Sequence, residues 1–195
     1  TRAIETLKSA AIAAHSKSAS QEMTHAWLFT GPPGSGRSNL ARAFAASLVC
    51  SNNGCGECID CQTATLGTHP DVEIFVTESV SIKVDDIREL VSRSSWGASV
   101  ASWRVIVIED CDRMTESSAN ALLKALEEPS PQSVWLLCAP TPEDVLPTIR
   151  SRCRIVNLIT PSNKDVSSFL QSELHTNSDK AIIAAAIAQG HIGLA

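Results

Sequence analysis

The sequence predicts an α/β fold, in which helices flank a parallel sheet, and three observations lead to this prediction. Continuous apolar runs at 27–30, 103–108 and 133–139 are typical of strands buried on both faces of such a sheet. Segments with apolar residues at helical spacing separate these runs. A glycine-rich turn also joins the first run to a helical pattern, which is the arrangement of a phosphate-binding βα unit.

The other elements follow from the same patterns in chain order. Helices are predicted at 4–12, 39–46, 82–91, 115–128, 144–148, from 165 onward and at 179–189, and further strands at 69–76 and within 149–156. We expect the first helix to cover the edge of a nucleotide pocket, 16–21 to form a loop, and Asp85 to be the N-cap of the third helix. Two domains result, an α/β domain at 1–159 and a small, incomplete helical domain at 160–195.

Composition limits the function classes. With 44 % hydrophobic residues and a net charge of −5, the 195 residues suit a globular core but do not attract nucleic acid over the whole surface. The absence of tyrosine argues against a stacking surface for single strands. Neither a signal peptide nor an apolar run of about 20 residues is present, so we expect a cytoplasmic protein without a membrane span. Because no initial methionine is present, we expect a segment of a longer protein.

The turn at 31–38 matches the phosphate loop G-x-x-x-x-G-K-[ST] except that Arg37 replaces lysine. Small residues let backbone N–H groups converge on a phosphate, and the following helix adds its positive end. A guanidinium is a wider, planar group than the compact ammonium of lysine, so it fits less well beside the terminal phosphates. Arginine at this position is therefore compatible with a bound nucleotide but unfavourable for its hydrolysis. The candidate phosphate-binding residues are Gly31, Gly34, Ser35, Gly36, Arg37, Ser38 and Asn39.

An acidic pair follows the second buried strand. Glu109 and Asp110 lie at the carboxyl edge of the predicted sheet, where nucleotide hydrolases hold magnesium and polarise water. Their order is the reverse of the usual Asp-Glu, and a displacement near 1 Å can lower a rate on the order of 100-fold. Solvated acids at a strand end are the alternative interpretation.

Four of the seven cysteines occupy one short stretch. Cys50, Cys55, Cys58 and Cys61 have the spacing C-x4-C-x2-C-x2-C, which lets four thiolates close on one tetrahedral zinc ion. An iron–sulfur cluster is disfavoured because no proline follows the last cysteine and no second set exists. We predict a structural zinc module at 50–61. His69 is better explained as a turn residue than as a further ligand, and Cys111 and Cys138 as core residues.

Arginines surround the start of the last strand. Arg152 would be an arginine finger if it projected from the domain edge toward another subunit's nucleotide. The alternative is a salt bridge to Glu127 or Glu128, or a helix cap.

Together these motifs resemble the AAA+ subunits of the bacterial DNA polymerase III clamp loader, most closely its δ′ (delta prime) subunits. The resemblance extends from about Thr24 to Ala195 and rests on the inserted cysteines, on Asn120-Ala121-Leu122-Leu123-Lys124 with Glu127-Glu128-Pro129, and on Ser151-Arg152-Cys153. It implies an AAA+ P-loop domain, a helical lid domain, and a collar domain that this chain lacks. It also implies a hetero-pentamer with motor and δ-type subunits, which loads the sliding clamp onto primed DNA.

In that family the arginine at the position of Arg152 reaches the ATP of the neighbouring subunit. The resemblance also implies a stator and not a motor, because four motor features are altered: Arg37, the inverted acids, Ala139-Pro140 at the first sensor, and Gly193 at the sensor arginine. ATP or ADP binding is then weak or absent. The alternatives are an ATP-hydrolysing γ/τ-like motor, and a zinc-ribbon DNA-binding module, which is disfavoured because 50–61 holds no lysine or arginine.

Overall fold

The computed structural model describes residues 2–16, 23–188 and 190–191. The helices are α1 (Arg2–His15), α2 (Arg37–Val49), α3 (Ile59–Leu66), α4 (Val84–Ser94), α5 (Glu116–Glu127), α6 (Pro147–Arg150), α7 (Asn163–Ser172) and α8 (Ser178–Ala188). The strands are β1 (Ala26–Thr30), β2 (Val72–Phe75), β3 (Arg104–Ile108), β4 (Ser133–Ala139) and β5 (Arg154–Asn157). Short 3₁₀ turns cover Cys111–Arg113 and Pro142–Asp144.

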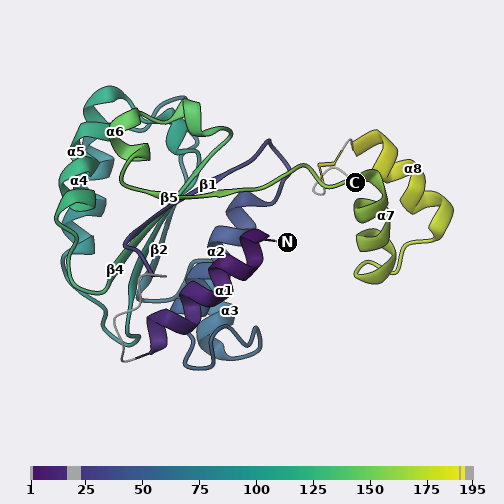
Figure 1. The fold of residues 1–195 in the computed structure, drawn as a ribbon, viewed down its shortest axis with the longest axis horizontal. Helices are drawn as coiled ribbons and strands as arrows, with labels where there is room; N and C mark the ends of the chain where they lie inside the picture. The colour runs from purple at the N-terminus through teal and green to yellow at the C-terminus, as the bar shows by residue number, and fades with distance from the viewer. Residues whose placement is uncertain (1, 17–22, 189, 192–195) are drawn as a thin grey trace.

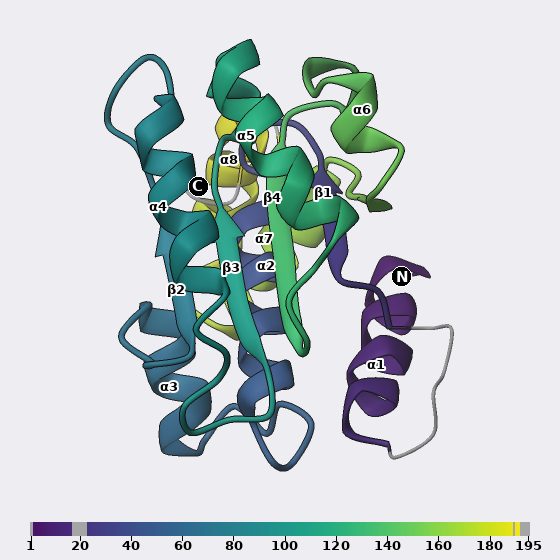
Figure 2. The same cartoon turned by 90° about the vertical axis from the view of Figure 1, so that its left-hand side faces the viewer.

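The five strands form one parallel sheet in the order β2-β3-β4-β1-β5. Strands β1, β3 and β4 are buried along their whole length, as their unbroken apolar runs predict. Figure 2 shows β3, β4 and β1 side by side, with α4 and α5 in front of them and α2 behind. The predicted α/β fold with a parallel sheet is therefore confirmed.

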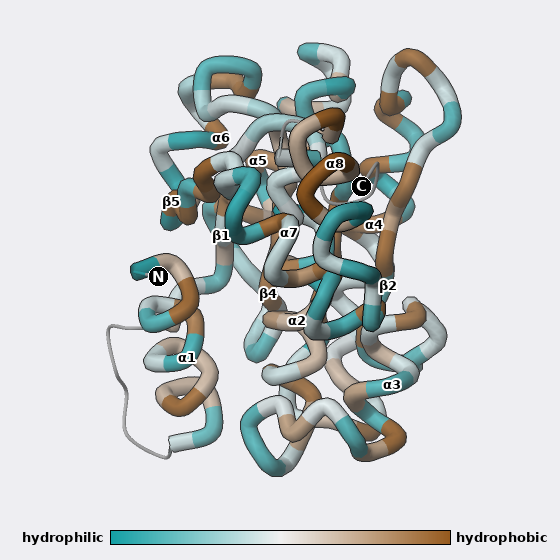
Figure 3. Tube along the Cα trace, turned by 90° about the vertical axis from the view of Figure 1, so that its right-hand side faces the viewer, coloured by the Kyte–Doolittle hydropathy of each residue, from teal (hydrophilic) through white to brown (hydrophobic). Residues whose placement is uncertain are grey.

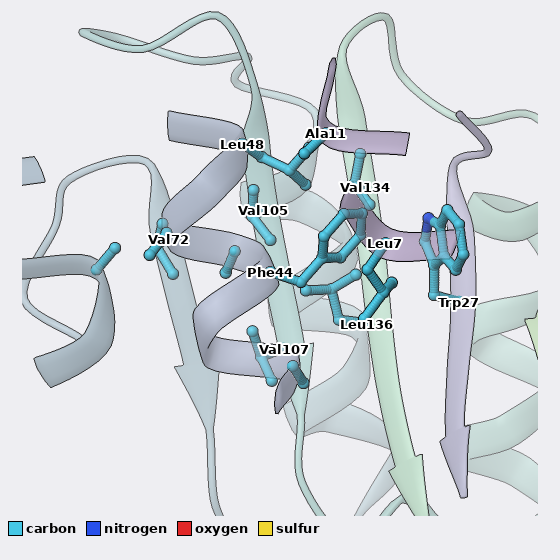
Figure 4. Close-up of a cluster of buried hydrophobic side chains, with 14 of the residues drawn as sticks. Leu7, Ala11, Trp27, Phe44, Leu48, Val72, Val105, Val107, Val134 and Leu136 are labelled. Atoms are coloured by element: carbon cyan, nitrogen blue, oxygen red, sulfur yellow. The ribbon is translucent and has the colours of Figure 1, made fainter. Parts of the chain in front are cut away.

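A hydrophobic layer lies on each face of the sheet. On one face Phe44 of α2 packs among strand residues and the small side chains of α1, and its ring lies 5.2 Å from that of Trp27, measured between centroids (Figure 4). On the other face Leu122 and Leu126 of α5 pack with Leu28 and Trp135. The alternation of side chains along each strand supplies both layers, so the sheet is held rigidly between them.

Three local predictions differ from the structure. Lys83, and not Asp85, is the N-cap of α4, because the Asp86 carboxylate accepts a hydrogen bond from the Lys83 N–H (3.1 Å) one turn earlier. The helix predicted at 144–148 is instead a 3₁₀ turn followed by α6, since Pro147 keeps Leu146 in an extended conformation. Helix α3, within the cysteine module, was not predicted. The loop predicted at 16–21 lies, beyond Ser16, outside the described residues.

Helices α7 and α8 stand apart from the sheet, at the end of an extended segment that follows β5 (Figure 1). They pack on each other through Val166, Leu170, Ala181 and Ala185. The Ser162 hydroxyl starts α7 by accepting a hydrogen bond from the Asp165 N–H. Helix α8 also exposes three isoleucines, and Figure 3 shows the hydrophobic stretches along it.

Candidate functional site

The glycine-rich loop lies at the carboxyl end of β1, between that strand and the first turn of α2. Gly34 and Gly36 have φ values of 81° and 84°, in the left-handed region that glycine adopts without strain. Gly36 is also the N-cap of α2, so the helix begins directly behind the loop. The chain thus forms the strand-loop-helix unit that the sequence predicts.

Arg37 contacts its own chain. Its Nη1 donates a hydrogen bond to the Gly31 carbonyl (2.9 Å), and its Nη2 lies 3.1 Å from Asp110 Oδ1. Only 13 % of the side chain is exposed. The guanidinium fork therefore joins the loop to the end of β3, a bridge that a lysine ammonium could not form with the same planar geometry.

The second acid is paired as well. Glu109 Oε1 accepts a hydrogen bond from Arg42 Nε and lies 2.9 Å from Arg42 Nη2. Arg42 was not among the predicted site residues, because it lies 67 residues from its partner in the sequence. Both acids are therefore brought to the loop, but each is neutralised by an arginine of α2.

Backbone groups of the loop also have partners within the chain. The Gly31 N–H donates to the Pro140 carbonyl (3.0 Å), and the Ser35 N–H donates to the Pro32 carbonyl (3.0 Å). The Thr30 hydroxyl donates to the Asn157 side chain at the same edge of the sheet. The Ala139-Pro140 pair thus anchors the loop by its backbone where a polar sensor side chain would stand.

The segment after α8 lies against this loop. A Cβ placed on Gly34 would stand 2.3 Å from the His191 ring, so His191 packs directly on the loop glycine. The Nδ1 atom of His191 is buried without a hydrogen-bond partner within the described part of the chain. The sequence analysis gave His191 no role of its own, and Gly193 lies outside the described residues.

A cavity of about 620 Å³ adjoins the loop on the side of α1. Arg2, Ala3 and Ile4 line it together with Ser35, Gly36 and Asn39. Helix α1 therefore lines a cavity beside the loop, and the expectation that this cavity is the edge of a nucleotide pocket stays a prediction. Ser38 lies in the first turn of α2.

The four predicted metal ligands lie together at the end of α2 and the start of α3. All four Sγ atoms are within 4.8 Å of one another, and Cys50 Sγ is 3.8 Å from Cys55 Sγ and 3.6 Å from Cys58 Sγ. A tetrahedral zinc ion with Zn–S bonds of about 2.3 Å separates its sulfurs by about 3.8 Å. The cluster could therefore hold a zinc ion.

Backbone N–H groups point at these sulfurs. Asn52 N–H donates to Cys50 Sγ (3.3 Å), Gly56 N–H to Cys61 Sγ (3.4 Å), and Cys61 N–H to Cys58 Sγ (3.4 Å). Burial alone raises the pKa of Cys50, but the surrounding N–H groups outweigh it and lower this pKa to about 6. Such donors favour the thiolate of Cys50, which is the form that binds metal. Burial instead raises the pKa of Cys61 to about 12.

Arg152 lies just after α6, at the domain edge. Its Nη2 is 2.6 Å from Glu127 Oε1, and its Nη1 donates to the Thr148 carbonyl (2.7 Å). The side chain is 35 % exposed. The salt bridge to Glu127 that the sequence analysis weighed is thus present, and the guanidinium remains accessible from outside.

Within the described residues, no helix is both long and apolar enough to cross a membrane.

His69 is buried in a turn, where its Nδ1 accepts a hydrogen bond from the Asp71 N–H (3.0 Å). It lies outside the four-cysteine cluster, as predicted.

Comparison with known proteins places these features in a family. The family described as DNA polymerase III, delta subunit, matches residues 7–162. DNA polymerase III subunit delta' of Pseudomonas aeruginosa is 42 % identical over 135 residues, covering 66 % of this chain and 41 % of that protein. The delta' subunit of Escherichia coli is 33 % identical over 177 residues, covering 88 % of this chain and 53 % of that protein. The chain thus spans about half the length of these relatives.

The similarity also extends to a gamma/tau subunit and to solved structures. The gamma/tau subunit of Mycobacterium bovis is 36 % identical over 135 residues, covering 67 % of this chain and 23 % of that protein. Among solved structures, a gamma-subunit-related protein of Thermotoga maritima aligns with a TM-score of 0.58 at 25 % identity, covering 94 % of this chain and 57 % of that one. The RuvB branch-migration motor of the same organism aligns with a TM-score of 0.68 at 19 % identity, covering 99 % and 58 %, which supports the AAA+ fold alone.

The cysteine cluster, the phosphate loop and the Ser-Arg-Cys segment therefore occur on a fold, and in a sequence context, shared with these subunits. The chain belongs to the delta subunit family of DNA polymerase III and is a delta'-like clamp-loader subunit.

Proposed function

We propose that this chain is a stator of the DNA polymerase III clamp loader: it supports ATP-driven loading of the sliding clamp onto primed DNA without being a motor itself. In this role it joins motor and δ-type subunits in a cytoplasmic hetero-pentamer. It also supplies Arg152 in trans to the ATP of a neighbouring subunit. The relatives' names support membership of the loader, and the division of roles within it is our inference.

The main support for a non-motor role is the inward position of Arg37. Its two hydrogen bonds go to Gly31 and Asp110, so the one cation of the loop already has anionic and carbonyl partners. Arg42 likewise occupies Glu109. To bind magnesium and phosphate, the site would have to break both ion pairs, which argues for weak or absent nucleotide binding and against hydrolysis.

Three further assignments accompany this role. Residues 1–159 form the AAA+ domain, and 160–195 form part of a helical lid, to which α7 and α8 belong. A zinc ion held by Cys50, Cys55, Cys58 and Cys61 is structural, since protein supplies all four ligands.

A motor role is the alternative. The 36 % identity to a gamma/tau subunit and the intact glycines of the loop favour it. In that case Arg37 and Ser38 would hold the phosphates and magnesium, with Glu109 and Asp110 as the acids. ATP turnover by the isolated full-length protein that depends on Arg37 would support this alternative.

The decisive experiment changes Arg152 in the complete loader. Arg152→Ala should abolish hydrolysis at the neighbouring site, because an arginine finger contributes on the order of 10³-fold or more to turnover there. Steady-state ATPase of the assembled complex, with clamp and primed DNA present, measures the loss.

Arg150→Ala is the matched control, since Arg150 lies two residues earlier and contacts Glu143 and the Pro142 carbonyl of its own chain. This control should leave turnover unchanged. Normal ATPase in an assembled Arg152→Ala complex would refute the proposed role of Arg152.

A further inference from the structure

Two glutamates stand at the negative end of α5, where a helix is least stable with acids. Glu127 is the last residue of the helix and Glu128 is its C-cap. Negative charge near the exposed carbonyl groups is unfavourable, and lysine or arginine is the stabilising choice there. A glutamate at position 127 therefore does not stabilise the helix, and its role is better sought in the contacts of its side chain.

The Glu127 carboxylate contacts the guanidinium of Arg152 at 2.6 Å. The same guanidinium donates through Nη1 to the Thr148 carbonyl, in α6. Two anchors on different helices thus hold the planar group against its own domain. Among the described residues, Glu128 forms no ion pair.

The restraint is weak enough to be exchanged. The side chains of Arg152 and Glu127 are 35 % and 50 % exposed. An ion pair with this much exposure to water shifts the equilibrium toward the paired state by no more than about fivefold. A phosphate can bind a guanidinium by two parallel charge-assisted hydrogen bonds, whereas the Glu127 carboxylate accepts one from Arg152, through Nη2. An incoming phosphate can therefore take Arg152 from Glu127.

We propose that Glu127 is a positioning residue that holds Arg152 against the subunit until the neighbour's nucleotide displaces it. This inference rests on the proposed role of Arg152. Glu127 competes with the phosphate, so it weakens the apparent affinity of the neighbouring site for ATP. It touches neither nucleotide nor magnesium, and it leaves the rate at saturating ATP unchanged.

The test is Glu127→Gln in the full-length protein within the complete loader. The substitution removes the charge but keeps the shape of the side chain. It should lower the KM for ATP about two- to fivefold with unchanged kcat, at low salt. Near 1 M salt, where the Debye length is about 3 Å, the difference should disappear.

Two comparisons isolate the effect. Glu128→Gln removes the neighbouring charge without touching Arg152 and should leave the KM unchanged. In an Arg152→Ala background, where turnover at the neighbouring site is lost, Glu127→Gln should leave the Kd for ATP binding to the loader unchanged, because Arg152, its ion-pair partner among the described residues, is already removed. A merely structural role of Glu127 predicts no gain in affinity in either background.

The experiments distinguish failure of the inference about Glu127 from failure of the proposed role of Arg152. If Arg152→Ala lowers turnover but Glu127→Gln leaves the KM unchanged or raises it, the inference about Glu127 is wrong and the role of Arg152 stands. If Arg152→Ala has no effect on turnover, both are wrong.

Discussion

Arg37 and Arg42 occupy the same helix and form ion pairs with the two acids that follow β3. The distances of 3.1 Å to Asp110 and 2.9 Å to Glu109 are those of direct ion pairs, and the pairs are partly buried. Such pairs are less screened by water than surface pairs, and breaking one leaves an unpaired charge in the site. Through these two side chains the glycine-rich loop and α2 are bridged to the residues that follow β3.

Asp71 shows a second way of placing a charge, inside the protein and without a cation. Its carboxylate is buried and accepts hydrogen bonds from the N–H groups of Ser99, Val100 and Ala101 and from the Ser99 hydroxyl. Burial alone raises the pKa of Asp71, but these donors outweigh burial and lower it below its ordinary value. The carboxylate thus ties the turn before β2 to the segment before β3.

We expect Asp71→Asn to destabilise the protein by about 2–3 kcal/mol at pH 7, because hydrogen bonds to a charged group are lost. The pKa of Asp71 in the folded protein lies below the unfolded value of about 3.9, so the ionised carboxylate stabilises the folded state above that pH. This stabilisation is lost as the pH falls through the folded-state pKa. The gap between wild type and variant should therefore shrink toward pH 3 in urea titrations. Asp85→Asn, in an exposed pair with Arg88, should change stability by less than about 0.5 kcal/mol. An equal gap at pH 7 and pH 3 would contradict this account.

At the scale of elements, the cysteine module connects two helices. Cys50 is the C-cap of α2, and Cys58 is the N-cap of α3, whose first turn contains Cys61. Gly54 and Gly56, both with positive φ, make the sharp turns between them. A metal ion at this point would fix the end of α2 against the start of α3.

The zinc assignment predicts about one ion per chain by metal analysis of the purified protein. A chelator should lower the unfolding midpoint, because metal binding energy is part of the folding energy in such sites. Cys58→Ser should lose the metal and the sensitivity to chelator. Ser51→Ala, an exposed change within the same module, should keep both. Metal-free protein with unchanged stability would remove the assignment.

Most elements followed from local patterns, and the exceptions have local causes. Strands β1, β3 and β4 were predictable because both of their faces are buried, which leaves unbroken apolar runs. Helix α3 was missed because its eight residues include an aspartate, a cysteine and three threonines or glutamines, which give no apolar stripe. The N-cap of α4 was misplaced because several acids stand near its start, and only geometry shows that Asp86 accepts from the Lys83 N–H.

At the scale of the molecule, the strand order brings distant residues to one edge. Strand β1 lies between β4 and β5, so the loop after β1 meets the residues that follow β4 and the segment beyond β5. Gly31 donates to Pro140, and Leu158 donates to Thr30. His191, from beyond α8, completes this edge against Gly34. The loop is therefore enclosed by its own chain on several sides.

This arrangement predicts that ATP or ADP with magnesium does not stabilise the isolated full-length protein. At 1 mM nucleotide, a site with a Kd of about 10 μM would add about 2.7 kcal/mol, or roughly 5–10 °C in Tm. We expect a shift below about 1 °C, with a gamma/tau subunit measured alongside as positive control. A shift of 5 °C or more, lost in Arg37→Ala, would favour the motor alternative.

The sequence by itself determined the buried strands, the phosphate-loop unit, the four clustered cysteines and the position of Arg152, because each is encoded by spacing within a few residues. Only the tertiary structure decided how the charges are paired. Arg37 with Asp110, Arg42 with Glu109, and Arg152 with Glu127 join residues 25 to 73 positions apart. Such pairs depend on strand order and helix placement, which local patterns do not encode.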